Sequence, residues 1–206
     1  MNKANFQTNH EEFDSWMFTY GDLIKRLVEA RRVVRTRFEK LELVEAFVLR
    51  CAVRWELLVV SDMITSLNRD SSKYASSLGL RLRKHLSYDE CKAILYGPRY
   101  LDFKSVDDIL SFSKKYLVPQ LNPFTAITKA CRTKIDEFLT IRNFLAHYSD
   151  FAKRSFQNLM KKAYNYRHVP EPGAFLISVM PSGQYRWGNY LLTFLKASGD
   201  MLGSVR

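Results

Sequence analysis

Apolar residues recur at intervals of three and four along most of the chain, which is the spacing of one face of an α-helix. The first stretch predicts a helix over residues 11–37, and the next predicts a helix over residues 41–67. Because the break between them is short, an antiparallel pair is favoured. The apolar stripe of the first helix consists of Phe13, Met17, Tyr20, Leu23, Ile24, Leu27 and Ala30.

The middle of the chain is marked by helix start and stop signals. Residues 68–84 are polar and rich in serine, which predicts a connector with one short turn of helix. Ser87 with Glu90 three positions later is typical of a capping box, and the helix that it starts should end before Pro98. Another short helix is predicted over residues 105–118, with acidic residues in its first turn.

The last third of the chain begins with a further start signal. Asn122-Pro123 places a capping side chain before a proline at the first helical position, and predicts a long helix. A helix over residues 151–166 should follow it, and a last amphipathic helix is predicted over residues 189–202. Between these two, residues 174–187 favour a short hairpin around Pro181-Ser182-Gly183.

Composition agrees with this pattern. A hydrophobic fraction of 47% and an aromatic fraction of 14% exclude a disordered chain, and 8 Gly and 6 Pro are few for the turns of an all-β fold. A length of 206 residues suits one core. We therefore expect an all-α bundle of four to five main helices in a single domain over residues 1–206. Its helical core should span about residues 11–166, with a C-terminal extension over about 167–206 that contains the hairpin and last helix.

The charge is strongly positive. With 32 Lys and Arg against 21 Asp and Glu, the net charge is +11. Such a surface attracts polyanions, nucleic acid first and an anionic membrane second, although some soluble proteins are basic without such a partner.

The sequence also indicates where the protein resides. The three cysteines are odd in number and too widely spaced for a structural zinc site, which favours a reducing compartment with buried, inert thiols. The start of the chain lacks an apolar signal core, and the longest apolar run, residues 57–60, is too short to span a bilayer. A cytoplasmic protein with no membrane partner is expected.

One segment carries residue types suited to catalysis. Asn143 and His147 lie four positions apart, and so on one face of the predicted helix, while Arg142 flanks that face. Histidine exchanges protons near neutrality, arginine matches phosphate oxygens, and asparagine can orient either of them by hydrogen bonds. This set suits cleavage of a phosphodiester without a metal or cofactor. The alternative is an ordinary cluster that caps the helix or forms ion pairs.

The string Arg142-Asn143-x-x-x-His147 resembles the signature of the HEPN superfamily, an Arg and a His separated by four to six residues, often with a polar residue directly after the Arg. A long helix precedes it and a basic helix start follows it, as in that superfamily, and the resemblance spans about residues 40–165. The segments that resemble the RiboL-PSP and MAE-type branches are Trp55-Glu56, Tyr100-Leu101-Asp102-Phe103 and Asn122-Pro123-Phe124.

The resemblance implies a helical bundle that usually forms a homodimer, in which two copies of the motif face one another and build one composite site. It implies attack of a ribose 2′-hydroxyl on the adjacent phosphate, with proton transfer by His147, charge stabilisation by Arg142 and orientation by Asn143. In the branch that a partner nucleotidyltransferase silences, a tyrosine stands two residues after the His. Here Tyr148 stands one residue after it and Ser149 takes the second position.

Other residues have two interpretations each. Glu56 lies in an apolar run, where it would either pair with Arg142 or reach solvent. Lys153 and Arg154, with Tyr148 stacking on a base, would contact RNA beside the motif, or form a solvated helix face. His10, His85 and His168 have no partners at ligand spacing and are expected at the surface.

Three hypotheses about function follow. The first is a metal-independent endoribonuclease, acting as a toxin or antiviral defence effector. The second is a non-catalytic HEPN module that binds RNA or nucleotide as a subunit of a larger complex. The third is a basic helical domain whose partner is a protein, such as an acidic antitoxin or a member of a defence complex.

Overall fold

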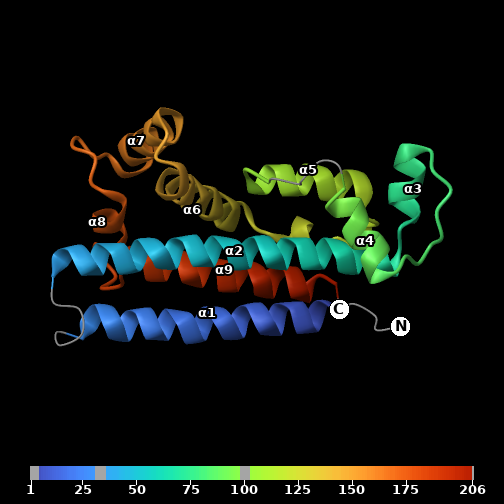
Figure 1. Ribbon diagram of the computed structural model, residues 1–206, viewed down its shortest axis with the longest axis horizontal. Helices are drawn as coiled ribbons and strands as arrows, with labels where there is room; N and C mark the ends of the chain where they lie inside the picture. Colours follow the sequence, from blue (N-terminus) through green and yellow to red (C-terminus); the bar gives the residue numbers. More distant parts are fainter. Residues whose placement is uncertain (1–4, 31–35, 98–102, 206) are drawn as a thin grey trace. The chain divides into compact units, whose positions relative to one another are not determined.

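The structure is a computed structural model that describes residues 5–30, 36–97 and 103–205 (Figure 1). Within these ranges the chain is helical and forms no strand, which confirms the predicted all-α class. Residues 31–35 of the first predicted helix and residues 100–102 of the segment that resembles the RiboL-PSP and MAE-type branches lie outside the described residues. The helices are α1 (Phe6–Glu29), α2 (Arg37–Arg69), α3 (Ser72–Leu78), α4 (Tyr88–Leu95), α5 (Val106–Tyr116), α6 (Lys129–His147), α7 (Asp150–Tyr164), α8 (Pro172–Leu176) and α9 (Arg186–Gly203), with short 3₁₀ turns η1 (Pro119–Leu121) and η2 (Pro123–Ala126).

The chain divides into two compact units. Unit 1 comprises residues 1–14, 55–132 and 196–206, and unit 2 comprises residues 15–54 and 133–195. The long helices α1, α2, α6 and α9 each contribute one part to either unit. The expectation of one domain over the whole chain stays a prediction.

In unit 1, the parts of α1, α2 and α9 meet around a buried histidine. His10 is 1% exposed, with Nε2 2.9 Å from Asp62 Oδ2 and Nδ1 2.7 Å from Ser198 Oγ. Asn9 Nδ2 donates to Asp62 Oδ1 at 3.0 Å. The expectation that His10 lies at the surface is therefore wrong, because its partners stand 52 and 188 positions away, where no local spacing reveals them.

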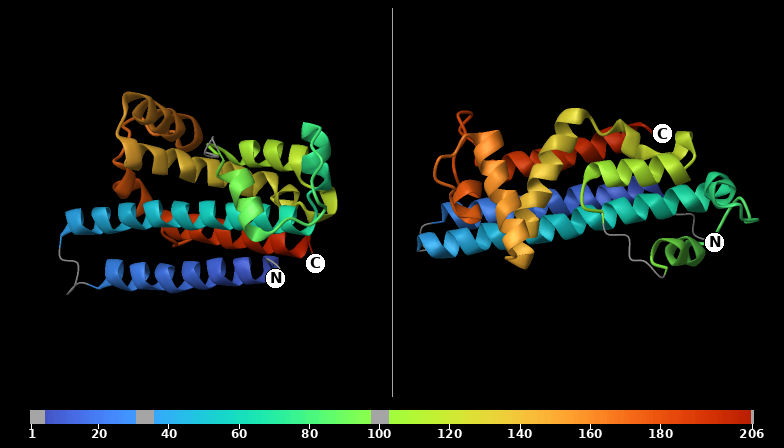
Figure 2. Two further views of the ribbon diagram at one scale, coloured as in Figure 1. Left: turned by 45° about the vertical axis from the view of Figure 1, so that its right-hand side comes forward. Right: turned by 90° about the horizontal axis from the view of Figure 1, so that it is seen from above.

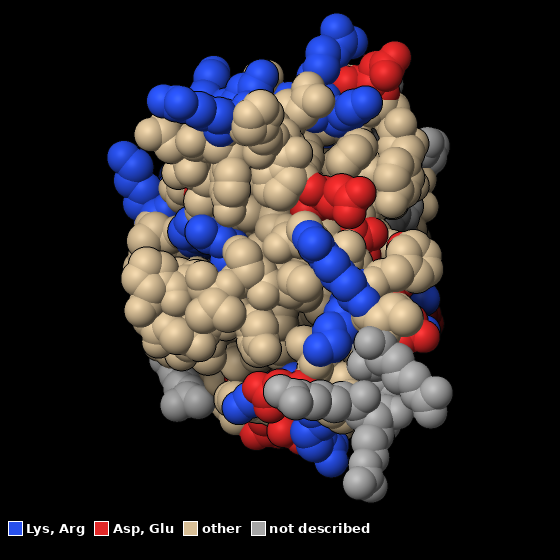
Figure 3. Space-filling view, turned by 90° about the vertical axis from the view of Figure 1, so that its left-hand side faces the viewer, with Lys and Arg blue, Asp and Glu red and all other residues tan. Residues whose placement is uncertain are grey.

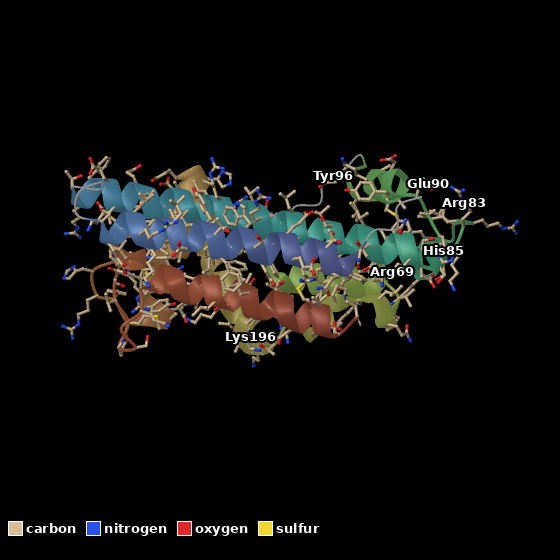
Figure 4. All side chains as sticks on the ribbon, turned by 90° about the horizontal axis from the view of Figure 1, so that it is seen from below. Arg69, Arg83, His85, Glu90, Tyr96 and Lys196 are labelled. Atoms are coloured by element: carbon tan, nitrogen blue, oxygen red, sulfur yellow. The ribbon has the colours of Figure 1, made fainter. Side chains whose placement is uncertain are left out.

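The connector of unit 1 contains the predicted short helix, α3, and a capping box. Ser87 Oγ accepts from the N–H of Glu90, and the carboxylate of Glu90 accepts from the N–H of Ser87, which confirms the start of α4. The same carboxylate forms an ion pair with Arg83, close to His85 (Figure 4). His85 is exposed, as is His168 in unit 2, so both of these surface predictions are confirmed.

The start of α6 differs from the prediction. Asn122-Pro123 begins only η2, where Asn122 Oδ1 accepts from the N–H of Phe124 at 3.3 Å. The helix itself begins at Lys129, after Thr128, whose hydroxyl accepts from the N–H of Cys131 at 3.4 Å. Two consecutive start signals thus open a 3₁₀ turn and then the long helix.

In unit 2, parts of α1, α2 and α9 lie side by side (Figures 1 and 2). Aromatic contacts join the three helices. The ring centroid of Phe47 lies 5.6 Å from that of Tyr20 and 5.3 Å from that of Trp187. A Cβ atom on Gly21 would lie 3.0 Å from a methyl group of Leu191, so glycine permits the close approach of α1 and α9.

The predicted hairpin is much reduced. Residues 172–176 form the short helix α8 instead of a strand, and only an isolated bridge joins Val179 to Tyr185. Gly183, at a φ of 81°, makes the turn between them, and α9 follows directly from Arg186. A single bridge leaves most backbone groups of this segment to be satisfied by helical and turn hydrogen bonds.

Two further features bear on the expectations from composition. No helix in the described ranges is long and apolar enough to cross a membrane. The three cysteines are buried thiols without disulfide partners, as predicted. Burial raises the pKa of Cys51 far above its ordinary value and the pKa of Cys91 to about 11, so both thiols stay protonated and unreactive at neutral pH.

Candidate active site at the end of α6

The structure places the predicted catalytic residues on the last turns of α6. Ile141 and Leu145 anchor this part of the helix in the core of unit 2, and His147 is its last residue. Tyr148 ends the helix with a φ of 45°, while its N–H still donates to the carbonyl of Phe144 at 3.0 Å. Ser149 then caps α7, so the chain turns immediately after His147.

Within the α6 motif (Arg142, Asn143 and His147), a side-chain hydrogen bond joins two adjacent residues. Arg142 Nη1 donates to Asn143 Oδ1 at 3.0 Å, and both side chains are half-buried. His147 is exposed, and its imidazole makes no hydrogen bond or ion pair with any other residue that the structure describes. Asn143 and His147 both lie within α6, about 6 Å apart along the helix axis.

Arg142 and His147 do not share a face of α6. Five positions correspond to about 140° around a helix, so a phosphate that contacts both must bridge two neighbouring faces. Glu56 belongs to unit 1 and Arg142 to unit 2, and their pairing stays a prediction.

A buried polar network holds α6 in place two turns before the motif. Glu137 Oε2 accepts from Lys134 Nζ at 2.7 Å, from the hydroxyl of Tyr164 at 2.6 Å and from that of Tyr190 at 3.4 Å. Burial alone would lower the pKa of Lys134, but its hydrogen bonds to Glu137 and Tyr164 raise it overall. The network ties α6 to α7 and α9 and thereby fixes the helix that carries the motif.

The sequence holds only a weak signal of this network. Glu137 stands four positions before Ile141 and hence on the core face of its helix, where an acid must be paired. Its tyrosine partners lie 27 and 53 positions away, so the sequence could not identify them.

Next to the motif, unit 2 contains an open pocket of about 380 Å³, named the Tyr148 pocket. Tyr148 and Lys153, two of the predicted RNA-binding residues, line it together, whereas Arg154 lies exposed on α7 with its Nε donating to the carbonyl of Asp150 at 3.3 Å. The other side chains of the lining are Phe38, Leu41, Glu42, Glu45, Phe144, Phe156, Gln157, Val169, Pro170, Glu171 and Pro172.

The pocket is acidic, which the sequence pattern did not predict. Glu45 is half-buried, and its Oε1 accepts from the N–H of Gly173 at 2.7 Å. Burial raises the pKa of Glu45, and the charges of Glu42 and Glu171 raise it further against the effect of Gly173. Burial, followed by the charges of Glu45 and Glu42, also raises the pKa of Tyr148.

The face of unit 2 that carries the start of α2 shows both signs of charge. In Figure 3 a small group of acidic side chains lies among uncharged ones, and Lys and Arg side chains gather along the upper edge, where α7 lies.

The acidic pocket could not be found from a local sequence pattern, because Glu45 and Gly173 stand 128 positions apart.

Metal ligation and similarity to known proteins were two further possible sources of information about function. Among the described residues, no three His, Cys, Asp or Glu side chains are grouped so that they could hold a metal ion. Searches of family models, curated proteins and solved structures find no match for this chain. Any function must therefore be argued from the geometry of the site.

Proposed function

We propose that this protein is a metal-independent endoribonuclease whose active site is the α6 motif. One observation carries the proposal. The guanidinium of Arg142 is oriented by Asn143, and an exposed imidazole with no partner in the described residues follows within the same helix. Transfer of a phosphoryl centre requires a fixed cation and an accessible proton carrier that can reach the same phosphate.

In the proposed reaction, a ribose 2′-hydroxyl loses its proton to an imidazole and its oxygen attacks the adjacent phosphorus. The new 2′-O–P bond forms as the bond from phosphorus to the 5′-oxygen breaks, and the 5′-oxygen takes up a proton. The products are a cyclic phosphate and a 5′-hydroxyl. Arg142 stabilises the negative charge that develops on the phosphate oxygens.

This reaction explains why two copies of the chain are proposed to act together. The step needs one imidazole that accepts a proton and a group that donates one, and His147 is the only histidine of the α6 motif. His147 of a second copy would supply the other proton carrier. A homodimer with the two motifs facing one another would also bring each Arg142 close to the partner's imidazole.

The surroundings of the motif support RNA as the substrate. Tyr148 is 67% exposed directly after His147, which suits stacking on an unpaired base. Lys153 and Arg154 are exposed on the first turns of α7, where they would contact phosphates. The net charge of +11 would concentrate RNA near this surface.

A nuclease of this kind must be held in check in the cell that makes it. We propose a cytoplasmic toxin or antiviral defence effector, regulated by an antitoxin or another protein of a defence complex. The shift of the tyrosine to the position directly after His147 argues for a mode of control other than modification of a tyrosine two residues after the histidine.

A second candidate function is a non-catalytic module that binds RNA or nucleotide within a larger complex. The observation that favours it is the exposed position of His147 without an orienting hydrogen bond in the described residues. Catalytic histidines are usually oriented by a third group. In the dimer proposed above, the second copy would provide that group.

The test is cleavage of total and transfer RNA in EDTA by the wild-type protein, Arg142→Ala and His147→Ala. We expect wild type alone to cleave efficiently and to leave cyclic-phosphate ends, with the rate falling about 10²- to 10⁴-fold in His147→Ala. The matched controls are Arg167→Ala and His168→Ala, which change exposed residues of the same types and should cleave like wild type.

Cleavage that EDTA abolishes, or that His147→Ala leaves unchanged, would contradict the proposal. Salt-sensitive RNA binding by folded protein without any cleavage would favour the non-catalytic module instead.

A further inference from the structure

The walls of the Tyr148 pocket are aromatic. The rings of Phe144 and Phe156 are stacked, with centroids 5.3 Å apart and an angle of 18° between their planes. The ring of Tyr148 lies 5.4 Å from that of Phe144, and Phe38, which is 69% exposed, forms part of the rim. A volume of about 380 Å³ lies in the range of small-molecule sites and suits a flat ligand the size of a nucleobase.

The charged groups of the pocket are mostly hydrogen-bond acceptors. Glu42, Glu45 and Glu171 contribute carboxylates, and Lys153 contributes the one ammonium of the lining. An ionised carboxylate accepts hydrogen bonds and cannot donate them. A ligand that fits must therefore present N–H groups to the acids, while any phosphate that it carries should lie toward Lys153.

This requirement separates the four bases of RNA. Guanine carries two adjacent donors on its Watson–Crick edge, at N1 and at the 2-amino group, which together match the two oxygens of one carboxylate. Adenine and cytosine offer an amino group beside an unprotonated ring nitrogen, whose lone pair would face the carboxylate. Uracil offers one N–H between two carbonyl oxygens, which would both be repelled.

We propose that the Tyr148 pocket binds a guanine base and that Glu45 recognises its Watson–Crick edge. The inference rests on the proposed ribonuclease function, for which it names the preferred substrate. Because Tyr148 follows His147 directly in the chain, a base in the pocket would place its own phosphate linkages next to the motif. Cleavage should therefore occur beside guanosine.

Glu45 is the acid best suited to this role because the fold holds it in position. The N–H of Gly173 binds Oε1, and a Cβ atom at position 173 would lie 2.7 Å from that same oxygen, so only glycine allows this approach. The carboxylate of Glu45 has remaining lone pairs that can accept from a ligand. Because Glu45 is half-buried, water competes less for these lone pairs than for those of the exposed Glu42 and Glu171.

The first experiment measures binding of guanosine, inosine, adenosine, cytidine and uridine to the wild-type protein by titration calorimetry or NMR. Nucleosides are used because they carry no phosphate, so Lys153 adds no charge attraction. Inosine lacks the 2-amino group but keeps N1–H. We expect guanosine to bind most tightly, and inosine about tenfold or more weaker, as is usual when half of a bidentate contact is lost.

The variant is Glu45→Gln, whose amide oxygen can still accept from Gly173, so the local fold is retained. Its amide NH₂ would face the donors of guanine, and we expect roughly a tenfold to hundredfold loss of guanosine affinity. Glu12→Gln, at an exposed acid outside the pocket, is the matched control and should bind guanosine like wild type. Guanosine binding should also weaken as the pH falls through the pKa of Glu45, which burial raises above the ordinary value for glutamate.

Equal affinity for all five nucleosides, no binding at all, or full binding by Glu45→Gln would overturn the proposal. Tight binding of arginine amide in place of guanosine would do so as well, since it would assign the pocket to a cationic side chain of a protein partner.

A second measurement separates this proposal from the ribonuclease proposal. RNA cleavage that depends on His147 but shows no preference for guanosine would support the ribonuclease proposal and contradict the guanine-binding proposal. Guanosine binding that depends on Glu45, in a protein that cleaves no RNA, would support the guanine-binding proposal and contradict the ribonuclease proposal.

Discussion

Two histidines of this chain lie in opposite surroundings. His10, in unit 1, is 1% exposed and has both ring nitrogens within hydrogen-bond distance of Asp62 and Ser198. His147, in unit 2, is exposed at the end of α6 and has no hydrogen-bond partner in the described residues. The first imidazole is held by the fold, and the second is accessible from solvent.

The difference shows why residue types alone do not identify a site. His10, Asp62 and Ser198 are the residue types of a serine-hydrolase triad, yet Asp62 and Ser198 are 0% exposed, so no substrate reaches the hydroxyl. A buried, satisfied network contributes to stability and to the specificity of packing. An accessible and unengaged histidine contributes little to stability.

The largest difference between the two histidines is expected when each imidazole is removed. His10→Ala leaves the carboxylate of Asp62 buried without its main partner, and we expect a loss of roughly 3–5 kcal/mol in the free energy of unfolding. His147→Ala should change that free energy by no more than about 0.5 kcal/mol, as is usual for surface substitutions. Urea unfolding followed by circular dichroism measures both. Equal destabilisation by the two variants would show that His147 is structural too.

A second variant tests whether burial of a polar group, rather than its location in unit 1 or unit 2, determines how much it contributes to stability. Glu137→Gln removes the charge that binds Lys134 and Tyr164 within unit 2, and we expect a loss of about 1.5–3 kcal/mol, typical of hydrogen bonds to a charged group. The same unfolding experiment on Glu12→Gln, an exposed acid, should show almost no change. A neutral effect of Glu137→Gln would mean that this network does not hold α6.

The smallest expected effect concerns the pH dependence of stability in unit 1. Burial raises the pKa of Asp14, although Ser198 and His10 nearby act to lower it. The folded state therefore binds this proton more tightly than the unfolded state, so the contribution to stability is fully present below pH 3.8 and is lost as the pH rises through the raised pKa. Asp14→Asn, which carries no charge at any pH, should gain stability relative to wild type at neutral pH and lose that gain in acid.

Urea unfolding at several pH values checks this sign. An advantage of Asp14→Asn that grows toward acid would mean that the charge of Asp14 stabilises unit 1, which is the opposite of the effect expected from burial of the carboxylate.

Much of the fold could be predicted because it depends on local patterns. The periodicity of three and four found the long helices, the capping box at Ser87 located the start of α4, and the acidic residues after Ser105 located the start of α5. The hairpin was predicted wrongly because residues 174–179 are apolar enough for either a strand or a buried helix, and Pro172 instead begins α8. The choice between them depends on the core into which Phe175 packs, which the local sequence does not specify.

The candidate site could be predicted only where it lies within one helix and the turn after it. Arg142, Asn143 and His147 are found from their spacing, and the contact between Arg142 and Asn143 joins adjacent residues. The acidic pocket could not be found in that way, because Glu45 and Gly173 meet only in the folded chain. For the same reason His10, whose partners are all distant, was expected at the surface.

We propose that His147, and not the triad-like His10, carries the chemistry. The most direct measurement is single-turnover cleavage of one RNA in EDTA by wild type, His147→Ala and His10→Ala, each at a temperature where its folded fraction has been measured. We expect His147→Ala to stay folded but to cleave about 10²- to 10⁴-fold more slowly, and His10→Ala to cleave at the wild-type rate per folded molecule. Wild-type cleavage by folded His147→Ala would contradict it.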